Sequence, residues 1–127
     1  MVARARRVAA LVLALAPLAG CASDSGPSPG FEAWQYTNAQ YVGVAGASLD
    51  RTWHATLAAL DQLGLNVRSK NRERLRGDIS AAEPDGTSVQ IELRRQSADF
   101  TRITVQVGLL GDEARSKAIV AKIKAGL

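Results

Sequence analysis

The sequence predicts an α+β fold, a two-layer sandwich in which an antiparallel sheet of about five strands is covered on one face by two helices. Two observations support this prediction. Apolar residues recur every three or four positions in two segments, as they do in amphipathic helices. Between these segments, four stretches alternate between apolar and polar residues, as half-buried strands do. One apolar sheet face and two apolar helix faces bury each other most simply as two layers.

Residues 36–45 are rich in Tyr and Val and predict a first strand, which ends at Gly46. A helix follows, because Ser48 can cap it, Asp50 lies near the positive end of its dipole, and Gly64 stops it. Its apolar side is expected to face the core and consists of Leu49, Trp53, Leu57, Leu60 and Leu63. The aromatic residues around the first strand are expected to pack in the core rather than form a membrane-interface belt; they are Phe31, Trp34, Tyr36 and Tyr41.

Four further strands are predicted, with a turn at residues 84–86 between the middle two. Their expected ranges are 65–71, 75–82, 87–94 and 100–108. Apolar residues in these strands, Leu75 among them, have odd numbers, and most polar residues have even numbers, so the sheet should have one covered face and one polar face. A last helix starts at Asp112 and Glu113, and its apolar side is formed by Ile119, Val120, Ile123 and Leu127.

Basic residues outnumber acidic ones on the predicted polar face. The candidate partner-binding residues share even numbers and are Arg68, Lys70, Arg76, Arg94 and Arg102. Matching the outward positions of neighbouring strands places Lys70 opposite Arg76 and Arg68 opposite Asp78. The row is either simply solvated or binds an anionic partner such as an acidic glycan, lipid headgroups or an acidic protein surface.

The first 20 residues have the anatomy of an export signal. Arg4, Arg6 and Arg7 form a positive start, residues 8–18 are apolar, and small residues precede Cys21. A membrane-spanning helix needs about 20 apolar residues, so this run is too short for a permanent span. We therefore expect residues 1–20 to be removed, leaving a mature protein without a transmembrane helix.

The segment Leu18-Ala19-Gly20-Cys21 resembles the lipobox of bacterial lipoproteins. This resemblance implies that the Cys21 thiol receives a diacylglyceryl group, that cleavage falls just before Cys21, and that the new amino terminus receives a further chain such as palmitate. Two or more chains make membrane anchoring effectively stable. Because Asp24 is not next to Cys21, the resemblance also implies sorting to the periplasmic face of the outer membrane in a cell with two membranes. The alternative is a free or intermolecularly paired thiol.

Residues 21–35 are expected to form the lipidated terminus and a flexible linker, since residues 22–30 are small, polar and twice interrupted by Pro. A single domain then spans residues 36–127. The net charge of +4 falls to +1 without the three leader arginines, so charge does not argue for nucleic-acid binding. Cys21 is the one cysteine, so no internal disulfide can hold the domain.

A wider resemblance covers residues 36–127. It rests on the run SLDRTWHATLAALDQLGLNV, followed by RGDISAAEPDGTSVQIEL, TRITVQVGLLGDE and a terminal amphipathic helix. These segments resemble a family of small bacterial lipoproteins that is catalogued only as a domain of unknown function. The resemblance implies a strand, helix, four-strand, helix order and an envelope location, and it brings no known activity or active-site residues. The Pro- and Ser-containing linker departs from the Gly- and Ala-rich stretch of many relatives.

His54 is the one histidine and follows Asp50 by one helical turn, so the two could form an acid–base pair. No nucleophile is placed near them and a metal site needs more ligands, so a solvated pair is the simpler interpretation. We therefore expect a non-catalytic envelope protein without a cofactor or metal, which binds a partner through the exposed sheet or the aromatic edge. The alternative is a periplasmic small-ligand carrier or enzyme accessory domain, which needs a pocket between helices and sheet.

Overall fold

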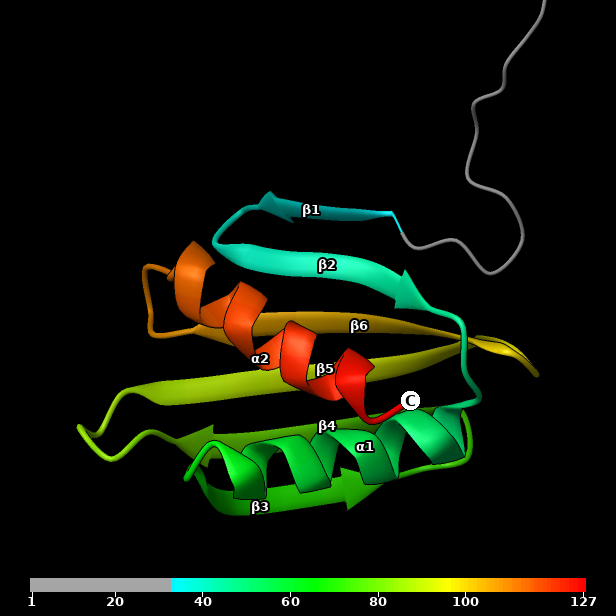
Figure 1. Cartoon of the computed structure of the whole chain (residues 1–127), viewed down its shortest axis with the longest axis horizontal. Helices are drawn as coiled ribbons and strands as arrows, with labels where there is room; N and C mark the ends of the chain where they lie inside the picture. The colour runs from blue at the N-terminus through cyan, green and yellow to red at the C-terminus, as the bar shows by residue number, and fades with distance from the viewer. Residues whose placement is uncertain (1–32) are drawn as a thin grey trace, which may run out of the picture.

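The computed structural model describes residues 33–127, which form a six-stranded antiparallel sheet with both helices on one face (Figure 1). The spatial order of the strands is β1-β2-β6-β5-β4-β3. In chain order the elements are β1 (Trp34–Thr37), β2 (Gln40–Ala45), α1 (Leu49–Gln62), β3 (Asn66–Arg72), β4 (Arg76–Ala82), β5 (Ser88–Ser97), β6 (Phe100–Val107) and α2 (Glu113–Ala125). The predicted α+β class is confirmed, with six strands instead of about five.

The extra strand comes from a tight hairpin inside the segment predicted as one strand. Asn38 and Ala39 both have positive φ, at 52° and 65°, and they connect β1 to β2. Positive φ at both central residues is typical of the two-residue hairpin turns whose twist matches that of the strands. Asn favours this conformation but Ala does not, so the local sequence signal for the turn is weak. β1 begins two residues before the predicted domain boundary at residue 36.

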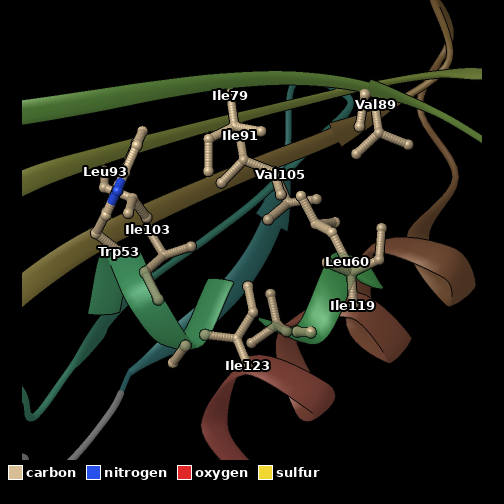
Figure 2. Close-up of a cluster of buried hydrophobic side chains, with 14 of the residues drawn as sticks. Trp53, Leu60, Ile79, Val89, Ile91, Leu93, Ile103, Val105, Ile119 and Ile123 are labelled. Atoms are coloured by element: carbon tan, nitrogen blue, oxygen red, sulfur yellow. The ribbon is translucent and has the colours of Figure 1, made fainter. Parts of the chain in front are cut away.

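The core fills the space between the helices and the sheet (Figure 2). Leu60 of α1, Ile91 of β5 and Ile123 of α2 are at most 2% exposed and belong to one cluster. The predicted alternation holds in β4, β5 and the greater part of β6, where odd-numbered apolar residues are buried. Leu75 is an exception, since it lies just before β4 and is 58% exposed.

Both helices begin at the residues that the sequence indicates. The Ser48 side chain accepts a hydrogen bond from the Arg51 amide at 3.2 Å, and the Asp112 side chain accepts one from the Arg115 amide at 3.0 Å. Each cap satisfies an amide that has no partner within its helix. Neither helix of the described segment is long and apolar enough to span a bilayer.

The aromatic residues of the first hairpin pack on the helix side of the sheet. Trp34 lies opposite Gly43 and stacks on Tyr41, with ring centroids 5.3 Å apart. A Cβ at Gly43 would fall inside the Trp34 ring, so glycine is what allows this close cover. The Lys124 ammonium of α2 lies 5.3 Å from the centre of the Trp34 ring. The expectation of packed aromatic residues is therefore confirmed for Trp34 and Tyr41.

The leader at residues 1–20, Cys21, Phe31 and most of the predicted linker lie outside the described residues.

Candidate functional site

The uncovered face of the sheet carries its polar side chains in cross-strand rows. In the row nearest the β5–β6 turn, Arg76 lies opposite Arg94, and Arg94 lies opposite Arg102. The next row places Asp78 opposite Glu92. Directly opposed side chains of antiparallel strands have Cβ atoms about 4.5–5.5 Å apart. Arg76, Arg94 and Arg102 therefore form a continuous strip across three strands, which we call the arginine row.

Two members of the arginine row are paired with the neighbouring carboxylates. One Arg76 amine nitrogen (Nη2) lies 3.0 Å from Asp78 and 3.3 Å from Glu92, and Arg94 Nε lies 3.1 Å from Glu92. The side-chain hydrogen bond to Asp78 is the main reason that the pKa of Arg76 is raised. Arg76 therefore stays cationic. The side chains that form these pairs are all at least one-third exposed; they are Arg76, Asp78, Glu92 and Arg94. Water therefore screens the pairs, and each contributes little to the free energy of unfolding.

Arg102 differs from the other two arginines. It is exposed, and no carboxylate of residues 33–127 lies within salt-bridge distance of its guanidinium. Two shallow hollows meet at this side chain. One, of about 370 Å³, is shared with Glu92, Arg94 and Thr104. The other, of about 290 Å³, is shared with Ala33 and residues of β1 and β2. Arg102 is thus a cation that remains open to an external anion.

The other two predicted members, Arg68 and Lys70, do not join this row. The β3–β4 register shifts between Val67 and Ser69, and Arg68 is the additional residue at that bulge. A bulge of one residue reverses which side chains face which side of the sheet. Lys70 therefore lies opposite the core residue Ile79 on the helix side.

The predicted cross-strand pairs of β3 are consequently wrong. Asn71, and not Arg68, lies opposite Asp78, while Arg72 lies opposite Gly77. The guanidinium of Arg72 is 3.9 Å from Asp50 of α1, which agrees with its place on the helix side. Single-residue alternation cannot reveal a bulge in a strand that is polar at nearly every position.

His54 lies on the exposed side of α1. Its Nδ1 is 2.9 Å from the backbone oxygen of Asp50 and 3.8 Å from the Asp50 carboxylate, and both side chains are more than 70% exposed. This arrangement is a solvated helix-surface contact. Within residues 33–127, no group of three or more His, Cys, Asp or Glu side chains is arranged to hold a metal ion.

Sequence reasoning missed one exposed apolar feature and several basic residues. Leu109 and Leu110 follow β6 and are each 91% exposed, in a loop that borders a hollow of about 640 Å³. Arg72, Arg74 and Arg95 lie at the same end of the strands as the arginine row, where β3 turns into β4 and β5 turns into β6. The signal for this second group was the density of arginines at the two predicted turns rather than their parity.

The fold and its uncovered face define a small α+β domain with a basic strip on an antiparallel sheet. A family model described as "Protein of unknown function (DUF3568)" matches residues 6–126, so the chain belongs to this family. The match confirms the resemblance to a family of unknown function. No curated protein matches the chain.

Proposed function

We propose that the protein is a lipoprotein of the bacterial envelope, anchored through Cys21, and that its domain is a non-catalytic binding module. The observation that carries the proposal is the order of a basic start, a short apolar run and Leu18-Ala19-Gly20-Cys21. Acylation of Cys21 would hold the domain at the periplasmic face of the outer membrane. The spacing of Asp24 from Cys21 supports that sorting.

The binding part of the proposal rests on the uncovered sheet face. Arg102 is exposed and has no carboxylate partner in the described part of the chain, and it lies beside Arg94. Asp78 and Glu92 offset the charges of Arg76 and Arg94, so the net positive charge of this part of the sheet face is centred on Arg102. The natural partner is therefore an anionic component of the envelope.

The alternative of a small-ligand carrier is less well supported. A carrier needs an enclosed space that buries most of its ligand. Leu60, Ile91 and Ile123 are at most 2% exposed and belong to the cluster between helices and sheet. The hollows considered above lie on the surface, where they favour contact with a larger partner.

The anchor is tested by replacing Cys21 in the full chain and supplying the producing cells with radiolabelled palmitate. The wild type should incorporate label and stay with membranes after a high-salt wash, whereas Cys21→Ala should incorporate none. Ser23→Ala is the matched control and should behave as the wild type. Palmitate incorporation by Cys21→Ala, or none by the wild type, would refute anchoring at Cys21.

A further inference from the structure

Charge is segregated along the strands. The two segments that form the β3–β4 and β5–β6 turns, residues 70–76 and 94–102, contain seven basic and two acidic side chains. The connections at the opposite end of the strands, residues 83–88 and 108–115, contain four acidic side chains and one basic side chain. We call the end of the sheet that carries residues 70–76 and 94–102 the hairpin end. Positive charge is therefore concentrated at the hairpin end, and negative charge at the other end of the strands.

Many cations at the hairpin end are not neutralised within the domain. Arg76 and Arg94 are paired with Asp78 and Glu92, and Arg72 reaches Asp50. Within residues 33–127, no carboxylate lies within salt-bridge distance of the remaining four, which are Lys70, Arg74, Arg95 and Arg102. Their charge is available to an external surface.

The two turns of the hairpin end form one platform. The Arg95 amide donates a hydrogen bond to the Leu75 carbonyl at 2.9 Å, which ties β5 to the β3–β4 turn. The Glu73 amide donates to the Arg76 carbonyl at 2.8 Å and closes that turn. Leu75 is 58% exposed between two arginines in the chain. An apolar side chain among cations suits the boundary between headgroups and acyl chains of a bilayer.

The chain enters the domain at this same end. Ala33, the first described residue, lines the same hollow as Arg102. From there β1 runs toward the end of the sheet opposite the hairpin end (Figure 1). Residue 33 follows Cys21 by 12 residues, and 12 residues span at most about 43 Å even when fully extended. A lipid on Cys21 would therefore keep residue 33, and the hairpin end beside it, within about 43 Å of the bilayer. At that distance even a weak contact is favoured by its high effective concentration.

We infer that the hairpin end rests on the bilayer that holds the anchor, with its arginines on anionic lipid headgroups and Leu75 at the headgroup boundary. This inference depends on the proposed lipid anchor and specifies the anionic partner as the membrane itself. Guanidinium groups bind phosphate oxygens through paired hydrogen bonds, and exposed contacts of this kind weaken as salt rises. In this orientation Leu109 and Leu110 face away from the membrane.

The orientation is tested with the lipid-modified full chain in vesicles of phosphatidylcholine alone or mixed with phosphatidylglycerol. A fluorescent donor is attached at Ala98→Cys on the hairpin end or at Ser88→Cys at the opposite end of the strands. Acceptors are placed on the lipid headgroups. Because the anchor consumes the Cys21 thiol, the introduced cysteine is the one that reacts. We expect anionic lipid to raise energy transfer from position 98 and not from position 88, and high salt to reverse the increase.

A charge-matched pair of variants locates the contact. Arg95→Glu combined with Arg102→Glu should remove the response to anionic lipid at position 98. Arg68→Glu combined with Lys122→Glu makes the same charge change at two exposed cations outside the hairpin end and should preserve the response; neither side chain has a carboxylate of residues 33–127 within salt-bridge distance. Circular dichroism verifies that both variants fold.

The outcomes separate the orientation from the anchor. Energy transfer from position 98 that is equal in neutral and anionic vesicles, or equal loss in the two double variants, overturns the orientation. The anchor is checked separately by flotation: full-length wild type, purified from the producing cells, that fails to float with neutral vesicles refutes the anchor. If that unanchored chain still floats with anionic vesicles through Arg95 and Arg102, the headgroup contact stands.

Discussion

Replacing Arg102 with Gln should make the isolated domain more stable. Arg102 lies directly opposite Arg94, and no carboxylate in residues 33–127 is within salt-bridge distance of it. Like charges directly opposite each other on antiparallel strands cost about 0.2–1 kcal/mol. Arg94 is partly neutralised by Glu92 at 3.1 Å, so the gain should lie near the middle of that range. We expect the free energy of unfolding to rise by about 0.5 kcal/mol.

Urea denaturation followed by tryptophan fluorescence measures this change. With a slope of about 1–3 kcal/mol per molar urea, a gain of that size moves the midpoint upward by about 0.2–0.5 M. The gain should shrink in high salt, because salt screens repulsion between exposed charges. A gain that is independent of salt would show that the repulsion is not its cause.

Arg68→Gln provides the matched control. Arg68 is also exposed, but it occupies the bulge of β3 and has no residue directly opposite it in the register. The same substitution there removes no directly opposed like charge, so it should not raise the free energy of unfolding. A lower stability of Arg102→Gln, or an equal gain from Arg68→Gln, would refute the reasoning.

Three further predictions concern the domain itself. Leu60→Ala should lower the free energy of unfolding by about 2–5 kcal/mol because Leu60 is fully buried, whereas Leu109→Ala should change it by less than about 0.5; equal losses in urea melts would contradict the assigned core. Ser116→Ala should raise stability by about 1 kcal/mol, since the buried Ser116 hydroxyl has no hydrogen-bond partner among the described residues; a loss in thermal melts would show that the hydroxyl is satisfied. The hydrogen bond from the Thr87 amide lowers the pKa of Asp85, so its stabilising contribution is complete above the ordinary pKa of about 3.9 and is lost as pH falls through the lowered value. The stability advantage of the wild type over Asp85→Asn should therefore shrink on acidification, and urea melts that show a constant advantage would contradict this.

Periodicity predicted the parts of the fold in which burial decides the side-chain pattern. In β4 and β5 and through most of β6, each side chain faces either the helices or the open side, so alternation revealed both faces. The helix caps at Ser48 and Asp112 were equally clear, since each is a good acceptor directly before an amphipathic segment. Local chemistry and tertiary packing agree at these positions.

Prediction failed where burial imposes no pattern. β3 is an edge strand of mostly exposed residues, so a bulge could shift Lys70 to the helix side without exposing an apolar side chain. At the β1–β2 turn, Ala39 adopts a positive φ that its sequence does not favour. That turn is stabilised by packing formed elsewhere, including Trp34 over Gly43 and Tyr41. Such contacts become visible only when the whole sheet is assembled.

Strand register also decides which of the predicted site residues lie together. Arg76, Arg94 and Arg102 fall in one row because the strands that carry them keep a regular register up to that point. The bulge removes Arg68 and Lys70 from the arginine row. The two hairpin turns, however, place Arg74 and Arg95 at the hairpin end beside that row. Repulsion makes the unpaired Arg102 unfavourable in the free domain, and an adjacent anion relieves that repulsion. If the hairpin end contacts an anionic surface as proposed, Arg102 would thus change from a position that costs stability to one that contributes to binding.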